Sequence, residues 1–122
     1  MHKDIQVLIK RLYHWSEADK EMKELARSHQ TVRDALIEAL NNKELTFQKR
    51  SIVRILGEVQ EKKAETAIRK FCESATHEPS LKRAAALALA NITGEDIKKY
   101  LSFEERYFKN VGSSGPNSRG FN

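Results

Sequence analysis

The chain has 122 residues, with 22 Lys and Arg against 17 Asp and Glu, a net charge of +5, five Gly, two Pro and one Cys. One domain with a substantial core fits this length, and abundant Ala, Leu, Glu, Lys and Arg with little Gly or Pro predicts an all-α fold. A single cysteine excludes an internal disulfide, and no window approaches the roughly 20 apolar residues of a membrane span, so we expect a cytoplasmic protein without a membrane partner.

The first two helices are predicted from apolar periodicity and from a start site between them. Residues 3–14 place apolar side chains on one face at helical spacing and charged side chains on the other. Ser16 then opens a second helix as its N-cap, because Asp19 follows three residues later and completes a capping box.

The third and fourth helices are more apolar than the second. Thr31 with Asp34 repeats the capping box for a helix over 32–41, and Thr46 is the expected N-cap of the next helix. Both helices should therefore contribute to the core. The apolar residues that we assign to them are Val32, Ala35, Leu36, Ala39, Leu40, Phe47, Ile52, Val53, Ile55, Leu56 and Val59.

After a polar turn at 60–63, the fifth helix is predicted over 64–75 and the sixth over 79–92. Nine of the fourteen residues in 79–92 are Ala, Leu or Ile. A helix that is apolar nearly all round must be covered on more than one side, so we expect this helix to be the central one. Pro79 suits its first turn, where the missing N–H leaves no hydrogen bond unmade.

The last predicted helix covers 95–109, with Thr93 and Asp96 as a third capping box. Its aromatic residues exceed what one face needs, so we expect it to cover the end of the fold or to form a homo-oligomer contact. The final segment, 112–122, has linker composition and is predicted to be disordered. The folded domain is therefore assigned to 1–111.

An internal repeat relates the fourth and sixth helices. Residues 49–59 align with residues 82–92 at an offset of 33 residues, with three identities and mostly the same apolar class elsewhere. The helices that follow also match in class. A fixed period of this length indicates stacked helix pairs, so the predicted fold is a short α-solenoid of antiparallel pairs, an α-α superhelix of about seven helices.

These segments carry a family resemblance. RSIVRILGEV, residues 50–59, and RAAALALANI, residues 83–92, resemble the first helix of the short HEAT-like repeats, which tends to run from Arg through small and apolar residues to Leu-Gly or Leu-Ala. Residues 32–40 resemble a second helix of the preceding pair. The resemblance covers about 31–101, and it implies a scaffold or binding surface rather than a catalytic centre.

A tetratricopeptide repeat is the alternative within the same kind of architecture. Ala67, Phe71 and Pro79 fit its pattern. However, Leu56 and Gly57 would have to lie two residues earlier, and the next unit lacks the Ala and the Phe. HEAT-like repeats therefore remain the prediction.

The HEAT-like resemblance also implies where a partner binds. Second helices usually line the concave surface in this family, and Arg together with apolar residues is typical of interface hot spots. We therefore predict a non-catalytic scaffold whose partner is another protein, and the positive net charge allows an acidic one. The predicted partner-binding residues are Arg33, Ile37, Arg69, Lys70, Lys98 and Lys99.

A nucleic-acid-binding module is the alternative function. Equivalent positions stack in a solenoid, so basic residues on two first helices would form a ridge suited to phosphates. Single-stranded nucleic acid also needs exposed aromatic residues between the bases, whereas the aromatic residues here lie mostly at core spacing. The ridge would consist of Lys49, Arg50, Arg54, Lys82 and Arg83.

No group of residues in the sequence predicts catalysis. His77 and Glu78 are similar to the His-Glu pairs that bind iron in some HEAT-like hydroxylases, but those enzymes need several pairs and this chain has one. Cys72 lies on an apolar helical face, where a free cysteine is usually a small buried hydrophobe. We therefore expect no enzyme activity, no cofactor and no metal.

Overall fold

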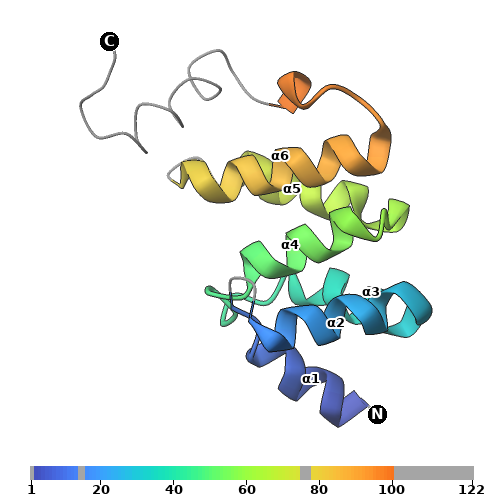
Figure 1. Ribbon diagram of the computed structural model, residues 1–122. Helices are drawn as coiled ribbons and strands as arrows, with labels where there is room; N and C mark the ends of the chain where they lie inside the picture. Colours follow the sequence, from blue (N-terminus) through green and yellow to red (C-terminus); the bar gives the residue numbers. More distant parts are fainter. Residues whose placement is uncertain (1, 14–15, 75–77, 101–122) are drawn as a thin grey trace.

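The computed structural model describes residues 2–13, 16–74 and 78–100, and every regular element in these ranges is helical (Figure 1). The all-α prediction is confirmed for this part of the chain. Among the described residues, no helix is both long and apolar enough to cross a membrane. The elements are α1 (His2–Lys10), α2 (Glu17–Ser28), α3 (Gln30–Ala39), α4 (Lys49–Glu58), η1 (Lys62–Ala64), α5 (Glu65–Ser74), α6 (Pro79–Thr93) and η2 (Ile97–Tyr100), where η marks a 3₁₀ turn.

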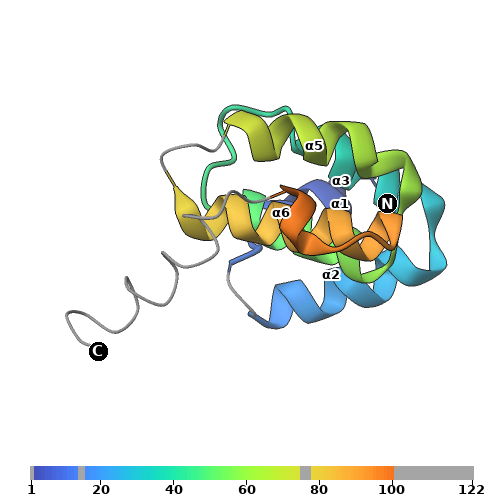
Figure 2. The ribbon, with the colours of Figure 1, turned by 90° about the horizontal axis from the view of Figure 1, so that it is seen from above.

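The helices lie in two layers. Figure 1 shows α2, α4 and α6 one above another, and Figure 2 shows α3 and α5 together on one side of this row. The contacts follow the same order: α4 packs against both α2 and α6, α3 packs against α2 and α4, and α5 packs against α6. At the other end of the row, α1 packs against α2 and α3.

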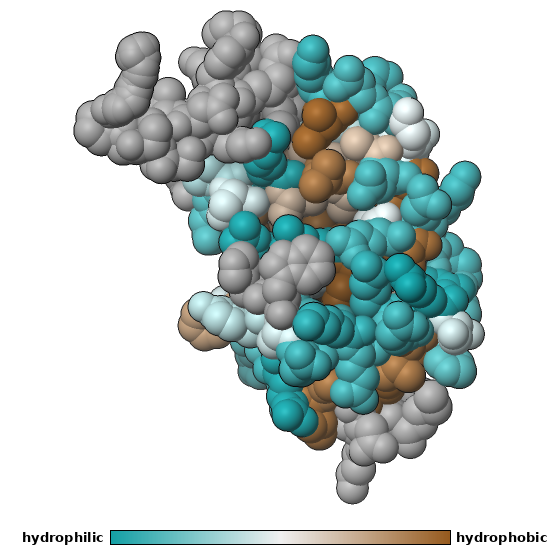
Figure 3. Space-filling model, in the orientation of Figure 1, coloured by the Kyte–Doolittle hydropathy of each residue, from teal (hydrophilic) through white to brown (hydrophobic). Residues whose placement is uncertain are grey.

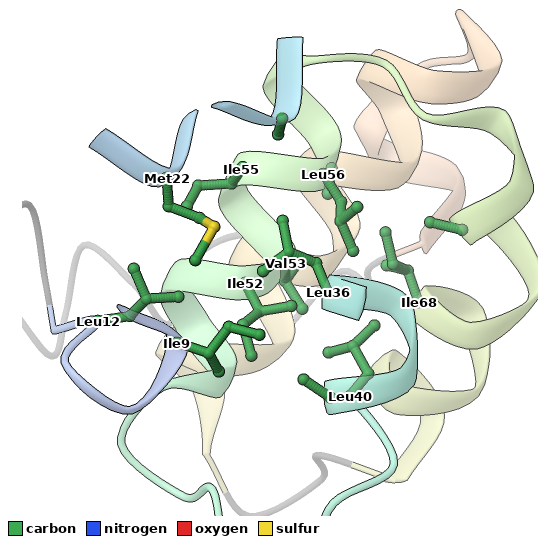
Figure 4. Packing of buried hydrophobic residues seen from close by; sticks show 14 of the residues in the cluster. Ile9, Leu12, Met22, Leu36, Leu40, Ile52, Val53, Ile55, Leu56 and Ile68 are labelled. Atoms are coloured by element: carbon green, nitrogen blue, oxygen red, sulfur yellow. The ribbon is translucent and has the colours of Figure 1, made fainter. Parts of the chain in front are cut away.

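The described core is centred on α4. This helix contacts α2, α3 and α6, and it buries Ser51, Ile52, Val53, Ile55, Leu56 and Gly57. Figure 4 shows the surrounding side chains that converge on it, including Ile9, Leu12, Met22, Leu36 and Leu40. The sequence prediction placed the central helix at 79–92 instead. α6 is indeed covered on more than one side, by α4, α5 and η2, but α4 has the middle position.

The backbones of α4 and α6 come very close at one point. A Cβ atom on Gly57 would lie 2.7 Å from both Cα and Cβ of Ala88, well inside the roughly 3.5–4.0 Å of a favourable carbon contact. Ala85, Ala86 and Ala88 on α6 are all buried. Small residues on both helices therefore allow the close approach.

Two helix starts have the residues expected from the sequence, and the end of α6 has a glycine that was not part of the prediction. Ser16 is the N-cap of α2, because its Oγ accepts a hydrogen bond from the Asp19 N–H at 3.3 Å. The Asp19 carboxylate accepts from the Ser16 hydroxyl and from the Tyr13 N–H, both at 2.8 Å. The Ser16 N–H bonds to the Tyr13 carbonyl at 3.1 Å, so the reciprocal bond of the predicted capping box is not formed. Pro79 lies in the first turn of α6, and Gly94 ends that helix at a φ of 80°.

The predicted cap at Thr31 is wrong. α2 and α3 are joined by one extended residue, His29. Its N–H donates to the Leu25 carbonyl, and its own carbonyl accepts from the N–H groups of Val32 and Arg33 in α3. α3 therefore begins at Gln30, and Thr31 lies inside it. Asp34 accepts a hydrogen bond from the Gln30 amide at 2.8 Å instead of completing a capping box.

The predicted cap at Thr46 is also wrong, because α4 begins three residues later at Lys49, with Gln48 as its N-cap. Phe47 consequently lies outside the helix, and 73% of it is exposed, although its spacing predicted a core position. In the same way α1 ends at Lys10, earlier than the predicted residue 14.

Thr93 ends α6 instead of starting a new helix. Its hydroxyl donates to the Leu89 carbonyl at 2.8 Å and accepts from the Glu95 N–H at 3.2 Å. The chain then forms η2, within the range where a helix over 95–109 was predicted. The rest of that predicted helix, its oligomer contact and the tail at 112–122 lie outside the described residues.

Candidate binding surfaces

Arg33, a predicted partner-binding residue on α3, is tied into the fold by several hydrogen bonds. Its Nε donates to Glu61 Oε1 at 2.7 Å, and its Nη2 donates to Gln30 Oε1 at 2.8 Å. Its Nη1 donates to the backbone carbonyls of Ala26 and Arg27. The guanidinium therefore joins the end of α2 and the start of α3 to the turn before η1.

Glu61, the acidic partner of Arg33, is only 7% exposed. Burial by itself would raise the pKa of this carboxyl. Hydrogen bonds from the Lys63 N–H at 2.8 Å, from Arg33 at 2.7 Å and from Gln30 at 3.0 Å outweigh burial and hold the pKa below its ordinary value of 4.5. Glu61 is therefore charged at neutral pH and forms a buried ion pair with Arg33.

The other predicted partner residues on α3 and α5 differ in exposure. Ile37 is half-buried and packs against the core. Arg69 donates to Glu65 at 2.6 Å and lies 5.4 Å from the centre of the Tyr100 ring. The hydrogen bond to Glu65 raises the pKa of the Arg69 guanidinium further above its ordinary value. Lys70 is exposed on the surface.

Lys98 and Lys99 lie in η2, which the contact between Arg69 and Tyr100 brings beside α5. The Lys99 ammonium is 2.9 Å from Glu95, whose carboxylate also accepts from the Tyr100 hydroxyl. The hydrogen bond from Tyr100 has the larger effect and that from Lys99 the smaller, and both lower the pKa of Glu95. Four of the six predicted residues therefore lie on α5 and the adjoining η2. Two of these four, Arg69 and Lys99, pair their charges with Glu65 and Glu95.

The predicted nucleic-acid ridge has fewer exposed charges than its sequence suggests. The Lys49 ammonium donates to a backbone carbonyl at the end of α3, and burial lowers its pKa. Arg50 and Arg54 lie one turn apart on α4. The pKa of Arg54 is lowered mainly by burial and also by the positive charge of Arg50. Lys82 and Arg83, on α6, are both half-buried.

An open groove of about 310 Å³ lies between α2 and α4. Lys23 crosses from α2 to Glu58 of α4 at 2.6 Å, and Arg27 pairs with Glu24 on the rim at 3.5 Å. Small-molecule sites are mostly apolar and enclosed, so this charge-paired groove lacks the character of one. It is lined by Asp19, Lys20, Lys23, Glu24, Arg27, Arg54 and Ile55.

Two exposed aromatic residues form a contact that sequence reasoning missed. The rings of Tyr13 and Phe47 meet edge to face, with centres 6.5 Å apart and planes at 74°. They are 62% and 73% exposed. Tyr13 lies in the connection before α2 and Phe47 in the connection before α4, and the Gln48 amide ties the two by donating to the Lys10 carbonyl at 3.0 Å. We call these two residues the aromatic pair.

The described part of the face in Figure 3 is mostly hydrophilic. Hydrophobic residues are visible in its upper part near α6 and again in its lower part near α1. Leu87 of α6 is 49% exposed, and Val7 of α1 is 55% exposed. Large exposed apolar side chains therefore occur at separate places, and the aromatic pair is where two of them touch.

Nothing resembling a metal centre gathers in the ranges that the structure describes, where no group of three or more metal-ligand residues occurs. Cys72 is buried, and its thiol lies 3.7 Å from the Lys82 carbonyl. Glu78 is the N-cap residue of α6, although its side chain makes no capping hydrogen bond. His77, the other half of the pair singled out in the sequence, lies outside the described residues.

No protein-family model, curated protein or solved structure matches this chain. The HEAT-like resemblance therefore rests on the chain's own residues.

Proposed function

We propose that the chain is a short α-solenoid of HEAT-like helix pairs and acts as a non-catalytic protein-interaction scaffold in the cytoplasm. The observation that carries this proposal is the matching burial of α4 and α6 at the offset of 33 residues. Leu56 and Leu89 are both fully buried, and so are Ile52 and Ala85. Repetition of packing positions, without repetition of a chemical site, is typical of solenoids.

The path of the chain supports the same proposal. In Figure 1, α2, α4 and α6 run in the same direction, and the chain returns through α3 and α5. Within the row of α2, α4 and α6, each helix contacts the next: α2 packs against α4, and α4 packs against α6. Contacts between nearest neighbours are what a stack of helix pairs requires.

The described surface favours binding over chemistry. Its groove is open and its charges there are largely paired, whereas aromatic and aliphatic side chains are exposed elsewhere. Aromatic residues are enriched at the centres of protein interfaces. A rigid helical frame that presents such residues is suited to hold a partner protein.

Affinity capture tests the proposal. The full chain is used to capture partners from cytosolic extract with and without nuclease, and the captured protein is then purified for titration. We expect a partner whose binding survives nuclease treatment. Replacing Arg69 and Lys70 with Glu should weaken this binding, whereas replacing Lys49 and Lys82 with Glu should leave it unchanged.

Nucleic-acid binding is the second candidate, and one observation favours it. Arg50 and Arg83 take equivalent positions on the neighbouring helices α4 and α6. This function predicts that replacing them with Glu weakens binding to random duplex DNA, and that the salt dependence of binding decreases by about one unit of slope for each lost phosphate contact. The scaffold proposal would be refuted if the chain bound DNA but no protein, and if only the variant with Glu at positions 50 and 83 lost that binding.

A further inference from the structure

The backbone around the aromatic pair is held by hydrogen bonds, although both of its side chains are exposed. Each ring rests on the other, and Tyr13 is anchored through its N–H to Asp19, a residue that is only 4% exposed. The hydrogen bond from Gln48 to Lys10 fixes the second connection to the first. Two rings that already contact each other in the free protein lose less entropy when a partner covers them than separate rings would, so the pair is suited to binding.

Positive charge surrounds the aromatic pair along the chain. Residues 10–13 and 43–50 contain five bases and one acid. Lys10 and Arg11 are exposed within three residues of Tyr13, and Arg50 follows Phe47 by three residues and is half-buried. Exposed aromatic residues with basic residues close by in the chain suit an interface hot spot, in which nearby charged groups select and steer the partner.

We infer that the aromatic pair and the basic residues Lys10, Arg11 and Arg50 bind an acidic protein segment that carries an apolar side chain. That side chain packs on the exposed Phe47 ring, and flanking carboxylates pair with the basic residues. The inference rests on the proposed scaffold function, and it adds a second contact site together with the chemistry of the segment that binds there. This site contains Tyr13 and Phe47, and it shares no residue with the set predicted on α5 and η2.

The geometry favours a protein segment over a nucleic-acid strand. Single strands bind by stacking successive bases on flat aromatic faces. The rings of Tyr13 and Phe47 stand at 74° to each other, so they offer no common plane to two consecutive bases. Lys49, which is close in sequence to Phe47, donates its ammonium to a backbone carbonyl and is not directed at a phosphate.

The test is a selection of phage-displayed random peptides on the immobilised full-length chain. Enriched sequences are synthesised with a fluorescein label, and their affinities are measured by fluorescence anisotropy. We expect Asp and Glu around a central Trp, Phe or Leu. Tyr13→Ser and Phe47→Ser should each weaken binding by about tenfold. Arg11→Glu should weaken it most at low salt, because salt screens exposed charges.

Two control variants separate the site from general effects. Leu87→Ser removes an exposed apolar side chain from α6, and Lys62→Glu reverses an exposed charge on η1. Both should leave peptide affinity unchanged. Circular dichroism melts of all variants should match the unsubstituted chain, because exchanges of exposed residues have small effects on stability.

Each other outcome overturns the inference. Peptides without acidic bias, equal affinity of the Phe47→Ser variant, or no enrichment at all would refute the proposed site. If the enriched peptides instead lose binding when Arg69 and Lys70 are replaced with Glu, the scaffold function stands and this site is wrong. If no peptide binds and random single-stranded DNA binds in a manner that depends on Phe47, both the site and the scaffold function fail.

Discussion

Replacing Gly57 with Ala tests the close packing of α4 on α6. In an exposed helix interior this exchange stabilises a protein by about 1 kcal/mol, because Gly loses more backbone entropy on folding than Ala. At Gly57 the added Cβ would lie 2.7 Å from both Cα and Cβ of Ala88. Favourable carbon contacts begin at roughly 3.5 Å, so the two helices would have to separate by about 0.8 Å.

The cost of this separation exceeds the gain in helix propensity. One of the two short distances is to the backbone Cα atom of Ala88, so no change of side-chain rotamer relieves it. Overpacking in a well-packed core costs about 1–3 kcal/mol, of which helix propensity offsets about 1 kcal/mol. We therefore expect Gly57→Ala to lower the free energy of unfolding by about 1 kcal/mol.

Urea unfolding followed by far-ultraviolet circular dichroism measures this change. A double-variant cycle with Ala88→Gly supplies the control, because that exchange removes the methyl group of Ala88 and leaves only its backbone in the way of the new Cβ atom. Gly57→Ala should therefore cost less in the Ala88→Gly background than alone. If Gly57→Ala instead raises stability by about 1 kcal/mol, as at an exposed helix position, the close packing of α4 on α6 is wrong.

Three further predictions concern stability. Leu89 is fully buried, so Leu89→Ala should cost about 2–5 kcal/mol in urea unfolding, and a loss below about 0.5 kcal/mol would contradict its core position. Gly94 has a φ of 80° and open space around its Cβ position, so Gly94→Ala should cost about 1–2 kcal/mol through backbone strain alone, with Asn expected to cost less in the same assay. Glu61→Gln should cost about 1–3 kcal/mol at neutral pH, because Arg33 loses a charged partner. The pKa of Glu61 in the folded protein is below its ordinary 4.5, so its contribution is present above that value and is lost as pH falls through the folded pKa. Urea titrations at stepped pH should show the gap between the two proteins closing in acid, and a constant gap would refute this.

The helices themselves could be predicted from the sequence because their periodicity is local. Apolar spacing located all six described α-helices, and Ser16 and Pro79 act at helix starts as their residue types predict. The burial of Leu56 and Leu89 also follows from their spacing. These properties depend on residues within one or two turns of each other, which the linear sequence records directly.

Helix boundaries were less predictable, because several residues nearby can act as caps. Thr31 and Thr46 have suitable side chains, yet α3 begins at Gln30 and α4 at Lys49. A cap contributes about 1 kcal/mol, so the packing of the adjoining connection can override it. The late start of α4 leaves Phe47 outside the helix and therefore exposed.

Contacts between distant segments were decided by the tertiary structure alone. Sequence spacing gives no indication that Arg33 meets Glu61, that Gly57 lies against Ala88, or that Tyr13 touches Phe47. Each contact joins residues about one repeat apart, and each depends on how far and in which direction one helix is displaced from the next. That displacement is set by the shapes of small and large side chains on both surfaces together, so no single segment contains it. The sequence by itself thus determined which segments are helical and which faces are apolar, and the packing of those helices decided which polar and aromatic side chains meet at the surface.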